Sequence, residues 1–300
     1  MQCQSCFSLC KSCFFENILL QYSYPDTFPE EPDMSSVILS ASYAHRRSHK
    51  SSHYHDCHQI IYITAGTASI RVGNTDYTAR AGDLVIFSRF EQHAVTSRSE
   101  DYRRYVLHIA PQLPAGSDIS ERLFTILSNR PAGFTNILDV RSDAEQIEEI
   151  IRRITLEQEQ QNLLSEAMEN LLMEALLICI HRRFPNYLDA ISEDCMKIIW
   201  QLQNRFETNY RQNYVLGDVA EEYGFSVSYL SHMFKKVTGN SIMGYLLSCR
   251  IAAAKKYLAE TTMSIGQIVE LCGFSDGSNF SRSFRQLTGL TPSQFRQAYQ

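Results

Sequence analysis

The sequence lacks an apolar run long enough to cross a membrane, because no stretch of about 18 uninterrupted apolar residues occurs in it. The best candidate runs from Leu171 to Ile180, and it is short and broken by Glu174. The N-terminus also lacks a basic segment followed by a clean apolar run, which a secretory signal peptide requires. We therefore expect no membrane span, no membrane partner and a cytoplasmic location.

The sequence has no excess of positive charge. Its 28 Lys and Arg face 33 Asp and Glu, a formal net charge of −5, which by itself argues against a nucleic-acid-binding protein. The charge is uneven, however. Residues 192–300 hold 11 basic against 9 acidic side chains, whereas the first 191 residues hold 17 against 24. With a chain of 300 residues, this asymmetry indicates two domains with different partners.

The nine cysteines do not form the even, regularly spaced set of a secreted disulfide framework. Four of them lie close together near the N-terminus: Cys3, Cys6, Cys10 and Cys13. Thiolates at these spacings could ligate zinc or an iron–sulfur cluster. The alternative is an unattached tail, such as a misplaced translation start would produce. This segment precedes a linker, Tyr24–Pro32, with three prolines in eight residues. We expect residues 1–33 to be a disordered leader.

Short runs that alternate apolar and polar residues predict strands between residues 34 and 115. The runs are Ile60–Thr64, Thr67–Val72, Thr75–Ala79, Asp83–Phe87 and Tyr105–Ile109. Gly73 and Asn74 predict a hairpin turn between the second and third runs. Strands this short and this closely spaced are typical of a β-sandwich or a small barrel.

Two amphipathic helices are predicted within residues 116–190. The first, Asp143–Glu159, has an apolar face made of Ile147, Ile150, Ile151 and Ile154. The second, Leu163–Phe184, has a predicted apolar face made of Leu164, Met168, Leu171, Leu172, Ala175 and Cys179. Pro185 ends the second helix. We expect both helices to pack on the barrel. From about Ser192 onward the pattern is helical throughout.

The helical C-terminal part contains an internal repeat. Leu216-x-x-Val219-Ala220-x-x-x-Gly224-Phe225-Ser226 recurs 49 residues later as Ile265-x-x-Ile268-Val269-x-x-x-Gly273-Phe274-Ser275. Each copy predicts a helix, a tight turn at the glycine and a second helix, over about 216–238 and 265–288. The inward residues of the second helices are Leu230, Phe234 and Val237 in one copy and Phe280, Phe284 and Leu287 in the other.

The outward face of each second helix is polar, which is typical of a recognition helix that enters the major groove of DNA. The outward residues are Ser228, Ser231, His232 and Lys235 in the first copy, and Ser278, Asn279, Arg282 and Arg285 in the second. Arg282 suits bidentate contact with guanine, and Lys235, Lys236 and Arg285 would lie near phosphates. A purely structural helical bundle is the alternative, which the duplicated turn, cap and polar face disfavour.

These residues resemble the signature of the AraC/XylS family of bacterial transcription regulators. The resemblance rests on Gly273-Phe274-Ser275, Phe280-Ser281-Arg282-x-Phe284-Arg285 and Gly289-x-Thr291-Pro292-x-x-Phe295-Arg296. It implies a seven-helix domain over residues 192–300 that binds double-stranded DNA, with a long helix, Ser241–Ala259, between its two helix-turn-helix units. The base-reading positions it implies are Ser228, Ser231 and His232, and Ser278, Asn279 and Arg282. Because the first helix offers only small serines and a histidine, its readout is expected to be thin or water-mediated.

Six of the nine histidines fall between residues 45 and 93. His53-x-His55-x-x-x-Gln59-x-x-x-x-x-x-Gly66 resembles the first cupin motif with Gln in place of Glu, and Gly82 with His93 resembles the second. Regulators of this family commonly carry such a barrel, which implies a small-molecule effector. Two interpretations stay open for His53, His55, Gln59 and His93. In the first, these residues bind a divalent metal ion. In the second, they line an effector pocket without a metal, which the Gln favours because it supplies no negative charge to a metal ion. We expect His45, His49 and His58 at the surface or in loops.

The predicted fold class is α+β multidomain: a cupin-like β-barrel (34–115), a helical packing and dimerisation segment (116–190) and an all-α domain with two helix-turn-helix units (192–300). The predicted function is ligand-responsive transcription regulation by a homodimer that reads DNA and contacts RNA polymerase if it is an activator. Glu157, Glu159 and Glu166 would rim the dimer contact. No catalytic activity and no cofactor are expected. The alternative is a metal-dependent cupin enzyme with an appended helical domain, although Asp56 and Glu91 have no recognisable catalytic spacing.

Overall fold

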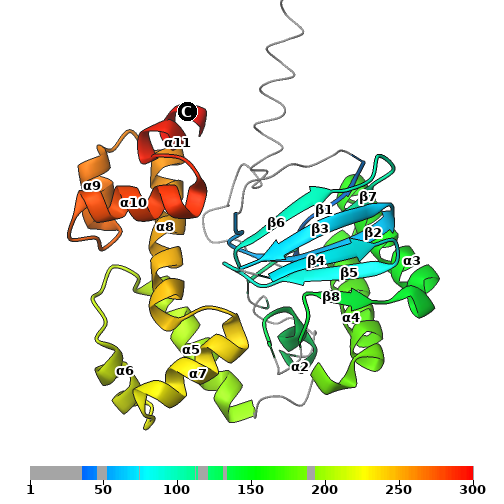
Figure 1. The fold of residues 1–300 in the computed structure, drawn as a ribbon, viewed down its shortest axis with the longest axis horizontal. Coiled ribbons are helices and arrows are strands. Elements are labelled where there is room, and N and C mark those ends of the chain that lie inside the picture. The colour runs from blue at the N-terminus through cyan, green and yellow to red at the C-terminus, as the bar shows by residue number, and fades with distance from the viewer. Residues whose placement is uncertain are drawn as a thin grey trace, which may run out of the picture.

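The computed structural model describes residues 36–45, 53–73, 75–111, 113, 121–130, 134–187 and 193–299. The leader (1–33) with its four cysteines, and also His49 and Asn74, lie outside the described residues. Within the described part of the chain, no helix is both long enough and apolar enough to span a membrane. A β-domain comes first and an all-helical domain follows it, which confirms the predicted fold class (Figure 1).

The β-domain is a sandwich of two antiparallel sheets. The larger sheet has the order β1-β7-β2-β5-β8, with β1 at Ile38–Ala44, β7 at Arg103–Ile109, β2 at His58–Ala65, β5 at Asp83–Phe87 and β8 at Ile137–Asp139. The smaller sheet has the order β4-β3-β6, with β4 at Thr75–Arg80, β3 at Thr67–Val72 and β6 at His93–Ser97. All five predicted strands are present, whereas β1, β6 and β8 were not assigned as separate strands from the sequence.

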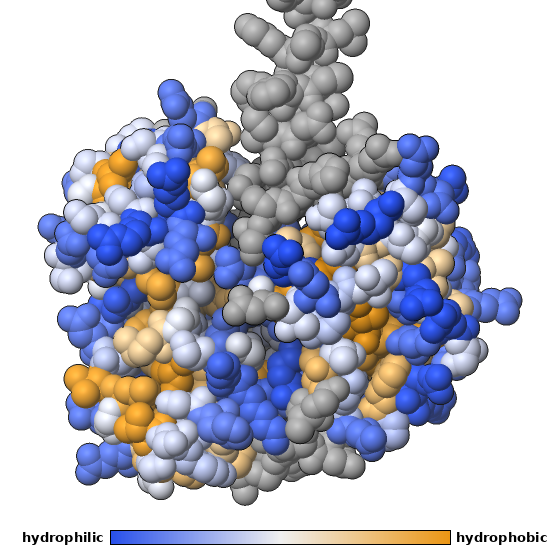
Figure 2. Space-filling model, in the orientation of Figure 1, coloured by the Kyte–Doolittle hydropathy of each residue, from blue (hydrophilic) through white to orange (hydrophobic). Residues whose placement is uncertain are grey.

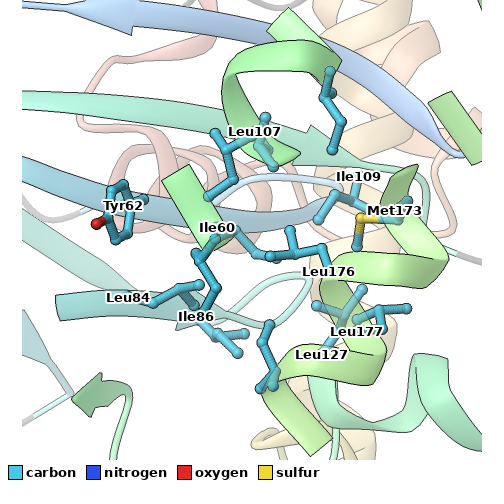
Figure 3. Close-up of a cluster of buried hydrophobic side chains, with 14 of the residues drawn as sticks. Ile60, Tyr62, Leu84, Ile86, Leu107, Ile109, Leu127, Met173, Leu176 and Leu177 are labelled. Carbon is cyan, nitrogen blue, oxygen red and sulfur yellow. The ribbon is translucent and has the colours of Figure 1, made fainter. Parts of the chain in front are cut away.

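Strand β2 is buried on both faces, which explains its uninterrupted apolar run Ile60–Ile63. Ile60 and Tyr62 point toward the helices, and Ile61 and Ile63 point between the two sheets. Figure 3 shows side chains of the large sheet meeting Met173, Leu176 and Leu177 of helix α4. The same alternation places Gln59 on the inner side of the sandwich. The prediction that His58 is a surface or loop residue is wrong, because it begins β2 and is buried.

Helices cover the outer face of the large sheet (Figure 1). They are α2 (Glu121–Phe124), a 3₁₀ turn (Thr125–Leu127), α3 (Ala144–Gln160) and α4 (Ser165–Arg183). The predicted inward face of α4 is largely wrong. Its buried apolar residues are Leu172, Met173, Leu176, Leu177 and Ile180. Leu164 and Leu171 are instead 72% and 61% exposed. The helix is apolar around most of its circumference, so spacing alone did not decide which side faces the sheet.

Seven helices occupy residues 193–299. They are α5 (Glu193–Thr208), α6 (Leu216–Glu222), α7 (Val227–Thr238), α8 (Ile242–Glu260), α9 (Ile265–Leu271), α10 (Gly277–Thr288) and α11 (Pro292–Tyr299). Two separate cores lie along α8: one includes Tyr245 and Cys249 with α5–α7, the other Ile251 and Leu258 with α9–α11. The long helix therefore serves as the shared wall of the two predicted helix-turn-helix units (Figure 1).

Candidate functional sites

Helix α7 is the second helix of the first helix-turn-helix unit. Gly224 ends the turn after α6 with φ at +70°, a conformation that a glycine adopts without strain. Ser226 then caps α7 by accepting a hydrogen bond from the Tyr229 N–H at 3.2 Å. Leu230 and Phe234 are fully buried. The outward residues lie as predicted: Ser228, His232 and Lys235 are exposed, and Ser231 is half-buried, as is the neighbouring Lys236.

Helix α10 repeats this construction in the second unit. The Asp276 carboxylate caps the helix and accepts hydrogen bonds from the backbone N–H groups of Ser278 and Asn279, at 3.1 and 2.8 Å. These backbone hydrogen bonds lower the pKa of Asp276. Phe280 and Phe284 are buried. The side chains on the predicted outward face, Ser278, Asn279, Arg282 and Arg285, are all exposed.

The two outward faces differ chemically. The second carries an amide and two guanidinium groups, whereas the first is built from hydroxyls, one imidazole and one lysine. Near the first face, Val215 and Val227 are 63% and 42% exposed. Figure 2 shows apolar spots in the lower-left region, where Figure 1 places α6 and α7. The donors suited to direct base readout therefore concentrate on α10.

Three of the predicted barrel histidines converge on one point. One ring nitrogen from each of His53, His55 and His93 lies within 4.8 Å of the others. The backbones of His53 and His93 form a pair of hydrogen bonds at 2.9 and 2.8 Å, which fixes the two segments against each other. The cupin-like spacing therefore correctly predicted that these residues meet.

A fourth histidine, which the sequence analysis missed, joins the group. His108 of β7 lies with its ring centre 5.1 Å from that of His55. The side-chain amide nitrogen of Gln59 is 2.9 Å from His108 Nε2 and 3.3 Å from His55 Nε2. Ser40 Oγ is 2.9 Å from His108 Nδ1. The sequence pattern of the predicted strand could have identified His108. Side chains alternate along a strand, so His108 points to the face opposite that of Leu107 and Ile109, which is the interior of the sandwich.

Burial and the neighbouring imidazoles keep the His55 ring neutral. Burial lowers the pKa of His55 well below its usual value, and the neighbouring His93, His108 and His53 lower it further. The His93 ring stacks on Phe87 with ring centres 3.8 Å apart, and its Nδ1 lies 2.8 Å from the Glu91 carbonyl oxygen. If Nδ1 donates this hydrogen bond, the lone pair of the ring is on Nε2, as in metal-binding histidines.

The β-domain inserts two aromatic side chains into the core of the first helix-turn-helix unit. Tyr54 and Phe90 are 6% and 3% exposed and belong to the same buried cluster as Phe206, Leu246 and Tyr245. The Phe90 and Tyr245 rings meet edge to face with centres 5.2 Å apart. No pattern in the sequence predicts this contact, since neither aromatic belongs to a periodic run.

A charged network lies beside these aromatics and crosses between the domains. Arg89 forms an ion pair with Asp56 at 2.6 Å on its own domain and with Glu207 of α5. The Tyr245 hydroxyl donates to Glu207 at 2.5 Å and accepts from Arg89 at 3.1 Å. Although burial opposes it, Asp56, Tyr245 and Glu207 raise the pKa of Arg89, so the guanidinium stays charged.

The family model of the AraC-like ligand binding domain matches residues 36–176, and that of a helix-turn-helix domain matches residues 219–298. The chain belongs to the AraC family of transcription regulators. This AraC-family chain is thus a DNA-binding transcription regulator with a ligand-binding N-terminal domain, as the repeat and the histidine pattern predicted.

Relatives of this AraC-family regulator match over most of its length or over part of it. The transcriptional activator RhaR of Pectobacterium atrosepticum is 25% identical over 252 residues, covering 82% of this chain and 86% of RhaR. The Msm operon regulatory protein of Streptococcus mutans is 30% identical over 126 residues, covering 42% of this chain and 45% of that protein. The crystal structure of unsaturated fatty acid bound ToxT from Vibrio cholerae shares the fold, with a TM-score of 0.55, 15% identity and coverage of 87% and 94%.

Proposed function

We propose that this regulator acts as a cytoplasmic homodimer whose barrel senses a small-molecule effector and whose two recognition helices read adjacent major-groove segments of double-stranded DNA. We propose a barrel over 34–115, a helical segment over 116–190 and a DNA-binding domain over 192–300, with β8 of the middle segment completing the large sheet. If it activates transcription, RNA polymerase is a further partner. The observation that carries this proposal is the duplicated, capped recognition helix with an exposed polar face.

We assign the readers by chemistry and exposure. On α10, Asn279 can donate to N7 and accept from N6 of adenine, Arg282 can donate two hydrogen bonds to guanine, and Ser278 adds a hydroxyl. On α7, Ser228, Ser231 and His232 give a thinner readout. The phosphate contacts are assigned to the remaining cations of the two helices, which are Lys235, Lys236 and Arg285.

The two carboxylates considered for the enzyme alternative, Asp56 and Glu91, are both paired within the described structure. The Asp56 carboxylate pairs with Arg89, and the Glu91 carboxylate pairs with Arg130 at 2.7 Å while accepting hydrogen bonds from Ser88 N–H and the Asn136 amide. A general acid or base must reach a proton of the substrate. Both candidate carboxylates are held by structural partners instead, which favours a sensor over a catalyst.

An exposed apolar strip on α4 supports the dimer. Leu163, Leu164 and Leu171 are 93%, 72% and 61% exposed, and Met168 between them is half-buried. Leu171 lies on the side of α4 that does not pack on the sheet, Leu163 and Leu164 directly precede the helix, and Met168 contacts the edge of the core. Contiguous exposed leucines on one helix are typical of a protein–protein contact. The predicted rim residues Glu159 and Glu166 are exposed, while Glu157 is half-buried and accepts a hydrogen bond from Ser165 Oγ at 3.0 Å.

Selection of genomic fragments by the purified full chain tests the proposal. We expect enrichment of a site with two short blocks spaced for two recognition helices on one DNA face. With about 6 phosphate contacts, the slope of log K against log salt should be about −5. If folded protein enriches no sequence, sequence-specific regulation is refuted. A slope near zero would show that the basic residues do not contact the DNA phosphates.

A further inference from the structure

We propose that the imidazoles of His53, His55 and His93 bind a divalent transition-metal ion, and that the ion controls how the DNA-binding domain docks on the barrel through Tyr54, Asp56 and Arg89. The inference deepens the proposed regulator function and rests on it, because it names the chemical class of an effector and the contacts that transmit its binding.

The donor set fits such an ion. Three imidazole nitrogens on two hydrogen-bonded segments already lie within 4.8 Å of one another. Nitrogens that share a tetrahedral zinc ion at about 2.0–2.1 Å stand roughly 3.3 Å apart, so ligation needs only a small inward movement. Imidazole ligands suit zinc, copper, iron and nickel rather than magnesium or calcium. The Glu91 carbonyl orients His93 from behind, in the way that outer hydrogen bonds orient metal-binding histidines.

The segment that supplies two of the ligands also supplies the interdomain contacts. Along residues 53–56 the side chains alternate between two destinations. His53 and His55 face the histidine cluster. Tyr54 enters the core of the first helix-turn-helix unit, and Asp56 pairs with Arg89. One short extended segment therefore has the metal site on one side and the DNA-binding domain on the other.

The third ligand is attached to the same interface. His93 closes the segment 88–93, whose Arg89 and Phe90 contact Glu207 and Tyr245 of the DNA-binding domain. The two segments are also joined directly, since the Phe90 N–H donates to the His55 carbonyl at 2.8 Å. Drawing the three imidazoles together would therefore hold both segments in one arrangement.

The geometry gives the direction of the effect. Tyr54, Phe90 and Arg89 are already docked while the three imidazole nitrogens are within one small movement of ligation. An ion that bridges His53, His55 and His93 restricts the two segments to this docked arrangement. It thus shifts the equilibrium toward docking by its preference for that state. By linkage, loosening the docking must weaken metal binding by the same factor.

Metal binding is tested on the full chain, prepared without a histidine tag and with Cys3, Cys6, Cys10 and Cys13 changed to Ser so that this N-terminal cysteine group cannot contribute. Titration with Co²⁺ should give one ion per chain and a ligand-field spectrum without thiolate charge transfer. His53→Gln and His55→Gln should each abolish that spectrum. The matched control is His45→Gln, because His45 is an exposed histidine outside the cluster. Absence of binding, or an unchanged spectrum in both ligand variants, would overturn the proposal.

Coupling is tested by hydrogen exchange with and without Zn²⁺. We expect exchange in peptides containing Tyr54 and Tyr245 to slow by about tenfold on zinc addition. Glu207→Gln, which alters only the DNA-binding side of the Arg89 network, should keep one zinc per chain but reduce the response at Tyr245. Zinc bound with no change at Tyr245, or an undiminished change in Glu207→Gln, would overturn the coupling. Enrichment of genomic DNA by metal-free protein tests the regulator function separately, so the two failures are distinguishable.

Discussion

Arg89 of the β-domain is paired with Glu207 of helix α5, and the two side chains are only 10% and 19% exposed. Asp56 of the β-domain approaches the same guanidinium from the other side, so one arginine pairs with a carboxylate from each domain. The connection between the sensor and the DNA-binding domain is therefore a desolvated charge network set beside an aromatic contact. Such networks are sensitive to the loss of one member because the remaining charges stay buried.

Arg89→Met should lower the free energy of unfolding by about 3–5 kcal/mol, because it leaves Asp56 and Glu207 without their shared cation. Glu207→Gln should cost less, about 1–3 kcal/mol, since Asp56 still neutralises Arg89. Urea denaturation of the full chain measures both. The control is Arg152→Met, which breaks a half-exposed pair with Glu149 at 2.8 Å and should cost under about 1 kcal/mol. Equal losses for Arg89→Met and Arg152→Met would contradict the structural role of the network.

Arg282→Ala should relax base preference at one position of the DNA site, since a bidentate arginine–guanine contact gives about 1–3 kcal/mol of discrimination. Lys235→Ala should weaken binding to all sequences alike, as the loss of a phosphate contact does. Binding to a panel of single-base operator variants separates the two. Arg282→Lys is the matched control, because it keeps the charge but not the planar fork. A uniform loss for Arg282→Ala would make Arg282 a phosphate contact.

His58 should make the fold sensitive to acid. It is buried in β2, accepts the Arg89 N–H at Nδ1 at 3.2 Å, and has Nε2 3.3 Å from the Pro111 carbonyl oxygen. Burial lowers its pKa to about 3, and Arg130 and Arg89 oppose protonation further. Between this value and the unfolded pKa of about 6.5, only the unfolded chain binds the proton, so stability falls as pH decreases through that window.

From pH 7.5 to pH 5.5 the expected loss from His58 is about 1.4 kcal/mol in the free energy of unfolding. His58→Asn keeps a polar acceptor but cannot titrate. Denaturant unfolding of both proteins at the two pH values should therefore show a smaller pH dependence in the variant. An identical dependence would mean that other groups cause the acid sensitivity.

The two turn glycines should respond differently to alanine. Gly224 and Gly273 have similar positive φ values, +70° and +76°, so both substitutions carry backbone strain of about 1–2 kcal/mol. A Cβ at Gly224 would meet nothing within 4 Å, whereas one at Gly273 would lie 2.6 Å from the Arg211 carbonyl oxygen. Gly273→Ala should therefore cost clearly more than Gly224→Ala in thermal or urea unfolding. Similar losses of unfolding free energy in the two variants would show that the backbone at Arg211 moves away from the new Cβ.

The exposed strip on α4 should control the oligomeric state. We expect Leu164→Lys combined with Leu171→Lys to give a monomer in sedimentation velocity, with little change in unfolding, because both side chains are largely exposed. Gln146→Lys on α3, another exposed helical position, controls for added charge. A variant that still sediments as a dimer would place the dimer contact elsewhere.

Local patterns in the sequence determined much of this molecule. The repeat located both helix-turn-helix units because a glycine turn, a cap and an i, i+4 apolar face are encoded within a few neighbouring residues. Two-residue alternation likewise located five strands, and the ranges Thr67–Val72 and Asp83–Phe87 match β3 and β5. The spacing of His53, His55 and His93 predicted their meeting, since a known barrel arrangement was recognisable from it.

Other features were decided only by tertiary packing. Helix α4 is apolar on nearly all sides, so only contact with the sheet determined that Met173 is buried and Leu171 exposed. His58 carries no local sign of burial, and His108 joins the cluster only because β7 pairs with β2. Arg89 and Glu207 are 118 positions apart in the chain. No periodicity links such distant residues, so their pairing follows from the docking of two domains that each fold around a core of their own.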